Sequence, residues 1–237
     1  KYSKVIIKIS GESLADRADS TILDRKKLAD VASAIAAVSA KGVQVGVVVG
    51  AGNIWRGRLS DKIGIEPAIG DYMGMLGTIM NSLALQSAFE EKGLSTRVMS
   101  SINVPQVCEP YIRRKAIHHL EKGRVVIFAG GTGNPFFTTD STATLRAKEV
   151  GADVILMGKN GVEGVFDSDP KTNPNAKLIK KLTFHEVVER QLGVMDLTAV
   201  AMLEDTDITI RVFNMASPDD VIKVIEGDDL GTTICKE

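Results

Sequence analysis

Several features that mark special classes of protein are scarce in this sequence. It contains only two cysteines, Cys108 and Cys235, with neither CxxC spacing nor interleaved histidines, which argues against a disulfide framework or a zinc site. We expect both cysteines to be small buried or neutral residues. Purely apolar runs such as residues 47–49 are far shorter than the roughly 20 apolar residues that a membrane helix needs. We therefore expect no membrane span.

An excess of charge of either sign is also missing. The 237 residues include 29 lysines and arginines and 30 aspartates and glutamates, for a formal net charge of -1. This balance gives no electrostatic reason to expect binding to nucleic acid or to a membrane surface, so any anion has to be bound by local groups. Residues 1–10 lack the pattern of a signal peptide, and we expect a cytoplasmic protein.

The composition that remains, 44% apolar and 25% charged, is typical of a folded globular protein with a substantial core. Short β-branched runs alternate with longer helical patterns, which predicts an α/β fold. Residues 125–128 are apolar at consecutive positions, as in a sheet covered by helices on both faces. The predicted strands are 5–9, 43–49, 95–99, 124–129, 154–157, 208–213 and 232–235. The predicted helices are 24–40, 72–91, 113–121, 141–150, 186–191, 196–204 and 218–225.

Glycine follows the predicted strands repeatedly. It occurs at Gly11, in residues 50–53, in residues 130–134, and at Gly158 and Gly161. In open α/β sheets, ligands bind beyond the carboxyl ends of the strands, and glycine turns let backbone N–H groups approach a phosphate. One such turn is more simply a tight βα connection, but four at equivalent strand ends favour a phosphate-rich ligand.

The standard phosphate-binding motifs are incomplete. Residues 50–52 begin like a dinucleotide fingerprint, but Trp55 stands where the third glycine is needed. Lys159 follows Gly158 without the other residues of a Walker A loop, and residues 167–172 lack the glycine of an EF-hand. Neither a P-loop, a typical dinucleotide site nor a calcium loop is supported.

Two cations and several carboxylates accompany the glycine turns. Lys8 lies inside an apolar strand and either meets an anion or faces solvent from an edge strand. Arg56 either forms the fork that binds phosphate or is a surface residue. Asp71 and Asp140 come at predicted helix starts, where capping is the strong alternative to a ligand role. Three further aspartates could orient lysines or metal-bound water, or could serve as caps: Asp153, Asp169 and Asp196.

Five segments carry a family signature. They are residues 8–12 (KISGE), 50–57 (GAGNIWRG), 70–75 (GDYMGM), 132–140 (TGNPFFTTD) and 212–214 (VFN), in this order. Together they resemble the bacterial uridylate (UMP) kinases of the amino acid kinase superfamily over essentially the whole chain. The segment 132–140 is highly specific, whereas the first segment alone is shared with carbamate, acetylglutamate, glutamate and aspartate kinases.

The resemblance implies a three-layer α/β/α sandwich with a mostly parallel central sheet, the amino acid kinase fold. In one continuous domain, residues 1–152 would form the acceptor (UMP) half and residues 153–237 the ATP half. The implied reaction transfers the γ-phosphoryl group of ATP to UMP, with Mg2+, and yields UDP and ADP for pyrimidine nucleotide biosynthesis. Members of the family are typically hexamers activated by GTP and inhibited by UTP. The apolar residues 73–80 are then either subunit interface or internal core.

The resemblance also implies roles for individual residues. Lys8 would bridge the transferring phosphates, and Asp140 would orient that lysine or a magnesium-bound water. Arg56 would bind the UMP phosphate, and Asp71 would hold the ribose hydroxyls. The remaining UMP residues would be Ala51, Thr132, Gly133, Asn134, Pro135, Phe136, Phe137, Thr138 and Thr139. The ATP residues would be Lys8, Ile9, Ser10, Gly11, Gly52, Asn160, Phe166 and Asp169. No protein metal ligand is predicted.

The sequence departs from the family pattern at three places. Ala51 replaces a glycine and requires a negative φ, and Glu163 replaces an aspartate. The stretch between Glu12 and Asp24 is shorter than the family's glycine-containing loop, which is associated with activation by GTP.

Two other functions compete with UMP phosphorylation. One is a kinase of the same superfamily that acts on a carboxylate or carbamate, against which Arg56 and the segment 132–140 argue. The other is a catalytically silent nucleotide-binding protein, which the presence of Lys8 and Asp140 disfavours.

Overall fold

The computed structural model describes residues 1–16, 18–158, 161, 163–215 and 218–237. Within these residues a nine-stranded sheet has the order β4-β3-β5-β2-β1-β6-β10-β11-β9. Among its described pairs only β10 with β11 is antiparallel, so the predicted α/β fold is confirmed. The sheet strands are β1 (Lys4–Ile9), β2 (Gln44–Val49), β3 (Thr96–Ser100), β4 (Glu109–Pro110), β5 (Val125–Ala129), β6 (Val154–Gly158), β9 (Lys181–Thr183), β10 (Thr209–Phe213) and β11 (Thr232–Cys235). A separate hairpin pairs β7 (Val165–Phe166) with β8 (Leu178–Ile179).

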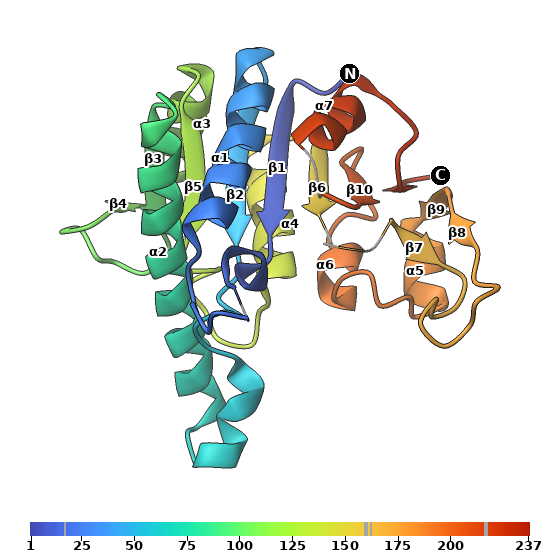
Figure 1. Cartoon of the computed structure of the whole chain (residues 1–237), viewed down its shortest axis with the longest axis horizontal. Coiled ribbons are helices and arrows are strands. Elements are labelled where there is room, and N and C mark those ends of the chain that lie inside the picture. The colour runs from blue at the N-terminus through green and yellow to red at the C-terminus, as the bar shows by residue number, and fades with distance from the viewer. Residues whose placement is uncertain (17, 159–160, 162, 216–217) are drawn as a thin grey trace.

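Helices cover both faces of this sheet (Figure 1). They are α1 (Arg25–Ala40), α2 (Pro67–Glu91), α3 (Arg113–Glu121), α4 (Thr139–Val150), α5 (Phe184–Glu189), α6 (Leu197–Ala201) and α7 (Pro218–Glu226), with short 3-10 helices η1 (Gly11–Leu14), η2 (Gly57–Leu59) and η3 (Asp61–Ile63). The helices α1, α2 and α7 share one apolar core with the sheet, and α3 to α6 share another. The three layers implied by the resemblance are therefore present.

The side chains of the central strand β1 alternate between the two cores. Val5, Ile7 and Ile9 belong to the core under α1, α2 and α7, whereas Ile6 belongs to the core under α3 to α6. Because strand side chains have a period of two, Lys8 faces the same side as Ile6, which is the side of α4. The alternation in β1 thus directs one cation toward the start of α4.

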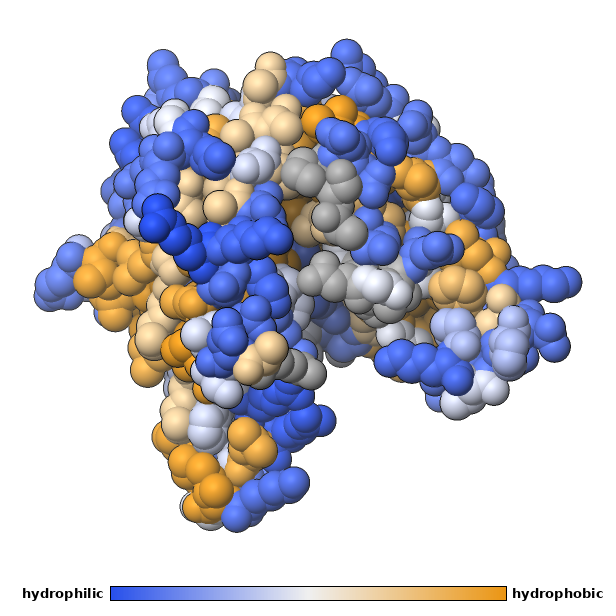
Figure 2. Space-filling model, in the orientation of Figure 1, coloured by the Kyte–Doolittle hydropathy of each residue, from blue (hydrophilic) through white to orange (hydrophobic). Residues whose placement is uncertain are grey.

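The carboxyl ends of β1, β2, β5 and β6 meet at one edge of the sheet, since these neighbouring strands are parallel. Gly11, Gly50, Gly130 and Gly158 all lie at this edge. Figure 2 shows the surface hollowed on the same side, between the projecting first half of α2 and the lobe that carries β7, β8 and α5. The predicted clustering of the glycine turns is confirmed.

Helices α2, α4 and α5 begin before their predicted starts, and at α2 and α4 the difference changes the roles of two aspartates. Helix α2 begins at Pro67 rather than near residue 72, because proline at the first helical position favours an earlier start. Helix α4 begins at Thr139, and Thr138 is its N-cap. Asp71 and Asp140 therefore lie inside helices, and the capping alternative is wrong for both.

The structure corrects some smaller expectations. The strands β4, β7, β8 and β9 were not predicted, because runs of two or three residues are too short to show a period. Cys108 and Cys235 are free and only partly buried. No described helix is long and apolar enough to cross a bilayer.

Candidate active site

A lysine and a carboxylate from different elements meet at the glycine-rich edge of the sheet. The Nζ atom of Lys8, near the end of β1, lies 2.8 Å from Oδ1 of Asp140 in the first turn of α4. Their side chains are 21% and 18% exposed, so the pair is shielded yet open to a ligand. Strand β1 lies between β2 and β6, so the alternative of a solvent-facing lysine on an edge strand is wrong.

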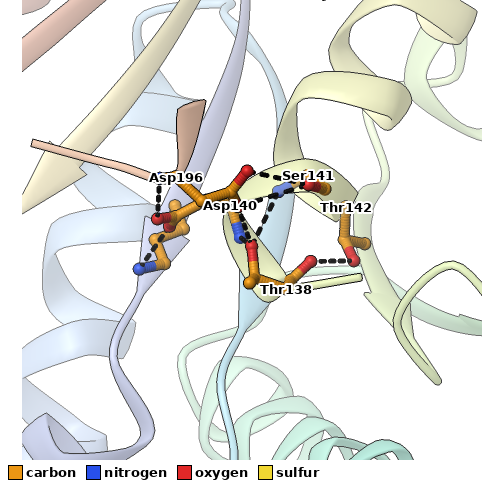
Figure 3. A network of polar contacts seen from close by, with 6 residues as sticks. Thr138, Asp140, Ser141, Thr142 and Asp196 are labelled. Atoms are coloured by element: carbon orange, nitrogen blue, oxygen red, sulfur yellow. Dashed lines mark hydrogen bonds and ion pairs between the residues drawn. The ribbon is translucent and has the colours of Figure 1, made fainter. Parts of the chain in front are cut away.

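A hydrogen-bonded network holds this carboxylate (Figure 3). The backbone N–H of Asp196 donates to Oδ2 of Asp140 at 3.3 Å. The carboxylate of Asp196 accepts from the hydroxyl of Thr138, from Ser141 Oγ at 3.2 Å and, as the N-cap of α6, from the N–H of Ala199 at 2.8 Å. Asp196 is therefore both a cap and a link between α6 and α4, and the network fixes the direction of Asp140.

Beside the pair lies a cavity of about 250 Å³, enclosed by the β2 turn, the first half of α2 and the start of α4. It is lined by seven of the predicted UMP residues: Ala51, Arg56, Asp71, Thr132, Phe137, Thr138 and Thr139. Gly52, which was assigned to ATP, also lines it. Side chains to which the sequence assigned no site role complete the wall: Trp55, Met75, Thr78 and Thr142.

The loop after β5, which carries the rest of the predicted UMP segment, contains several residues with positive φ next to this cavity. Gly130, Gly131 and Gly133 have φ angles of 74°, 58° and 83°, which only glycine adopts readily. Phe136 also has a positive φ, of 70°, and its N–H donates to Oδ2 of Asp71 at 2.8 Å. Asp71 therefore anchors the loop to α2. The predicted residues that do not line the cavity are Gly133, Asn134, Pro135 and Phe136.

The β2 turn is held by contacts that sequence reasoning did not identify. Ala51 is not among the described residues with positive φ, so the condition for an alanine at this position is met. The Arg56 guanidinium pairs with the Glu12 carboxylate through Nη2 and donates from Nε to the carbonyl of Gly52 at 3.3 Å. Glu12 belongs to the first signature segment, but no sequence pattern predicted its ion pair with Arg56.

A second, larger cavity of about 750 Å³ lies on the other side of Lys8. Of the predicted ATP residues, Lys8 and Ser10 line it, together with Glu12, Gly158 and Lys171 among others. This arrangement places the Lys8 ammonium at the wall of the larger cavity while Thr138 and Thr139, next to Asp140, line the smaller one.

The other predicted ATP residues are dispersed. Ile9 is 1% exposed with its side chain in the core, and Gly11 is buried where a Cβ would lie 2.5 Å from the Gly50 carbonyl oxygen. Phe166 belongs to β7, and Asp169 accepts from the N–H of Lys171 at 2.9 Å. Asn160 lies outside the described residues.

Asp153 does not belong to the site. It accepts hydrogen bonds from Ser3 N at 2.6 Å, Ser3 Oγ at 2.8 Å and Lys4 N at 2.9 Å, at the amino end of β1. Partial burial raises the pKa of this carboxyl, but the donors from Lys4 and Ser3 outweigh burial and lower it below its usual value. Of the roles left open for Asp153, orienting a lysine or a metal-bound water at the active site is therefore wrong.

The fold and this edge are typical of one class of protein, the α/β proteins that bind phosphate groups at glycine turns. Residues 3–214 match the amino acid kinase family, and the chain belongs to that family. It is 51% identical over 234 residues to the uridylate kinase of Limosilactobacillus reuteri, covering 99% of this chain and 97% of the relative. It is 50% identical over 237 residues to the uridylate kinase of Mycoplasmopsis synoviae, covering 100% and 99%.

Solved structures agree with these sequence relatives. The UMP kinase from Bacillus anthracis superposes with a TM-score of 0.96 at 42% identity, covering 100% of this chain and 97% of that one. The UMP kinase from Ureaplasma parvum gives a TM-score of 0.93 at 40% identity, covering 100% of both chains. The resemblance and the amino acid kinase fold inferred from the sequence are confirmed.

Proposed function

We propose that this chain transfers the γ-phosphoryl group of ATP to UMP and releases UDP and ADP. The observation that carries this proposal is the Lys8–Asp140 pair, 2.8 Å apart, between a cavity at the glycine turn of β1 and a cavity at the loop after β5. Two phosphates that enter from opposite sides would meet at the lysine ammonium. The full-length similarity to uridylate kinases supports UMP as the acceptor.

The chemistry requires little of the protein besides position and charge. An oxygen of the UMP phosphate attacks the γ-phosphorus of ATP, and the bond from that phosphorus to the bridging oxygen of ADP breaks. Both reactants are anions, so a cation at the point of transfer offsets their repulsion and the charge that spreads over the transferring oxygens. Lys8 supplies this cation. Asp140 holds the ammonium in place and is itself directed by the Asp196 N–H.

The acceptor occupies the smaller cavity. Arg56 binds the UMP phosphate with its guanidinium fork, which requires that the phosphate share or replace the carboxylate of Glu12. The backbone at Ala51 and Gly52 faces the same phosphate. Asp71 accepts from the ribose hydroxyls through Oδ1, since its Oδ2 already accepts from the Phe136 N–H. Thr132 and residues 137–139 of the loop contact the nucleotide, and residues 133–136 lie beside the cavity.

The donor occupies the larger cavity, with its phosphates at Lys8 and Ser10 and at the backbone of Ile9 and Gly11. Residues 153–237 form the ATP half, and Phe166 and Asp169 lie on the adenine-ribose side. Only the backbone of Ile9 is available for this role, because its side chain is buried in the core. Lys171 adds a further cation to the lining of this cavity, which also includes the carboxylates of Glu12 and Asp16.

The residues present suit a magnesium ion carried by the nucleotide. Among the described residues no group of three histidine, cysteine, aspartate or glutamate side chains could hold a metal ion. Mg2+ usually keeps several waters and binds one or two carboxylates plus substrate phosphates, for which Asp140 is the available carboxylate, since that of Asp196 accepts three protein donors. When bound, Mg2+ neutralises charge on the ATP phosphates.

The active form is a homo-oligomer, a hexamer by resemblance, with activation by GTP and inhibition by UTP. Helix α2 supports association because one of its faces is apolar and exposed. Ile69, Tyr72, Leu76 and Met80 are 51%, 40%, 49% and 51% exposed, at a spacing that aligns them along the helix. Figure 2 shows hydrophobic side chains along the projecting half of α2. Residues 73–80 were expected to be either subunit interface or internal core, and the segment contains both kinds of side chain. Met75 and Ile79 are buried in the core, whereas Leu76 and Met80 belong to the exposed face.

One assay separates this function from its competitors. Purified protein with Mg-ATP and UMP, CMP, dUMP, carbamate or glutamate should release ADP selectively with UMP. Turnover only with carbamate or a carboxylate would contradict the proposal in favour of another reaction of the family. Binding of nucleotide without turnover would identify a silent nucleotide-binding protein instead.

A further inference from the structure

A buried arginine lies beneath the loop that encloses the acceptor. Arg146, in α4, is 3% exposed, and a charge so deeply buried is costly unless its hydrogen bonds are satisfied. Its Nη2 donates to Ser101 Oγ at 2.6 Å and to the Gly131 carbonyl at 3.4 Å. Ser101 Oγ in turn donates to the same Gly131 carbonyl at 2.9 Å. The guanidinium and the serine thus converge on one backbone oxygen of the acceptor loop.

The opposite side of the guanidinium is fixed just as firmly. Its Nη1 pairs with the Glu149 carboxylate, and its Cζ lies 3.8 Å from the centre of the Tyr111 ring. The Tyr111 hydroxyl donates to Glu149 Oε2 at 2.6 Å. Burial raises the pKa of Tyr111, and the adjacent Glu149 carboxylate adds to this, so the phenol keeps the proton it donates. Arg146 is therefore neutralised, stacked and oriented on one side while it holds the loop on the other.

The loop needs such support because its own backbone provides little rigidity. Gly130, Gly131 and Gly133 have the greatest conformational freedom of any residue type and are held with positive φ. Ser101 packs closely against two of them, since a Cβ would lie 3.1 Å from Ser101 N at Gly130 and 3.2 Å from Ser101 Cβ at Gly133. Gly131 lines the acceptor cavity directly.

We propose that Arg146 is a positioning residue for the acceptor, acting through Ser101 and Gly131, and this inference rests on the function proposed above. Helix α4 carries Asp140 in its first turn and Arg146 further along. One rigid element therefore sets both the carboxylate that orients Lys8 and the loop that places the acceptor nucleotide. Arg146 is not among the described residues that line the donor cavity.

The decisive variant is Arg146→Lys. A lysine keeps the positive charge and can pair with Glu149, but its compact ammonium cannot also reach Ser101 and Gly131 as a planar fork does. We expect a roughly tenfold increase in KM for UMP, the size expected for one charge-assisted hydrogen bond, with KM for ATP unchanged. The dissociation constant for UMP alone, measured by calorimetry without ATP, should rise by a similar factor.

Two further variants guard against a purely structural explanation. Ser101→Ala removes the other donor to Gly131 and should raise KM for UMP in the same way, while the double variant should fall short of the product of the two effects. Tyr111→Phe disturbs the same buried cluster without a contact to the loop, since it removes the hydroxyl beside Glu149 and Arg146 and leaves the Arg146 donors to Ser101 and Gly131 in place. It should lower the melting temperature and leave KM for UMP within twofold of the parent.

Two results would overturn the inference. One is an Arg146→Lys enzyme that loses thermal stability as Tyr111→Phe does but keeps the parent KM for UMP. The other is a normal KM for UMP in Ser101→Ala. If the parent enzyme used a different acceptor, the proposed function would fail by itself, and KM for that acceptor would replace KM for UMP in the same comparison.

Discussion

At the scale of single residues, Lys8 differs from the other lysine of its strand only in position. Lys4 and Lys8 project from the same side of β1, because four residues separate them in a repeat of two. Lys4 Nζ donates to the Val150 carbonyl at 2.8 Å at the amino end, whereas Lys8 meets Asp140 at the carboxyl end. The end of the strand at which a lysine lies therefore decides whether it meets the cavities.

This comparison yields a prediction for Lys8→Ala. Loss of one preorganised donor to the transferring phosphoryl group should cost about 2.7 to 4 kcal/mol, or roughly 100- to 1000-fold in kcat. Thermal stability should fall far less than kcat, since both side chains of the pair are partly exposed, although the Asp140 Oδ1 atom that Lys8 contacts is itself buried. Steady-state kinetics and a thermal melt measure both quantities. Lys4→Ala is the control, and an equal loss of kcat in the two variants would contradict the role of Lys8.

At the scale of elements, Asp153 connects the amino ends of two neighbouring strands, because it lies just before β6 and binds the start of β1. Its carboxylate accepts three donors from Ser3 and Lys4 at the start of β1, so the two central strands begin in register. The pKa of Asp153 is lower in the folded protein than its usual value of 3.8. The stabilisation by the ionised form is therefore fully present above pH 3.8 and is lost as the pH falls through the lower, folded-state pKa.

Asp153→Asn should accordingly lower the free energy of unfolding at neutral pH, by about 1–3 kcal/mol for hydrogen bonds to a charged group. The difference from the parent should shrink as the pH is lowered below 3.8, where the parent also loses the charge. Urea denaturation at neutral and acidic pH measures this difference. A difference that is equal at both pH values would show that the carboxylate charge is not responsible, and kcat at neutral pH should be unchanged.

At the scale of the whole molecule, α2 joins the exposed apolar face to the active site. On its buried side, Thr78 Oγ1 accepts from the Gly130 N–H at 2.9 Å, and Asn81 Nδ2 donates to the Gly50 carbonyl at 2.7 Å. Asn53 and Asn81 also exchange amide hydrogen bonds at 2.8 Å and 3.0 Å. The glycine loops after β2 and β5 are therefore both hydrogen-bonded to α2, and the opposite side of this helix carries Leu76.

Leu76→Lys should weaken association and, through α2, reduce kcat/KM for UMP. A lysine placed in an apolar contact would have to bury an unpaired charge, which is costly. Light scattering coupled to size-exclusion chromatography measures the mass of the parent and the variant. Leu76→Met keeps an apolar side chain at the same position and should retain the parental mass. An unchanged mass for Leu76→Lys would exclude this face as an interface.

The sequence by itself determined the longer strands, the helices and the edge at which the site lies, but not the short strands β4, β7, β8 and β9. Periodicity and strand-end glycines need only neighbours along the chain, so the strand at residues 232–235 and the helix at 113–121 were predicted with the bounds that the structure has. The segments 8–12 and 132–140 also pointed to Lys8 and Asp140. The predicted starts of α2 and α4 were nevertheless too late in the chain, because apolar periodicity is weak in these helices.

Only the tertiary structure decided which distant groups touch. Glu12 and Arg56 are 44 residues apart, and Arg146 lies 45 residues from Ser101, so no local pattern records either contact. Such pairs form only once the sheet has assembled, because β1, β2 and β3 end, and α4 begins, at the same edge of the sheet. Residue type and local spacing can be read from the chain itself. The convergence of distant side chains arises only from tertiary packing, and the pairing of charges in this site depends on that convergence.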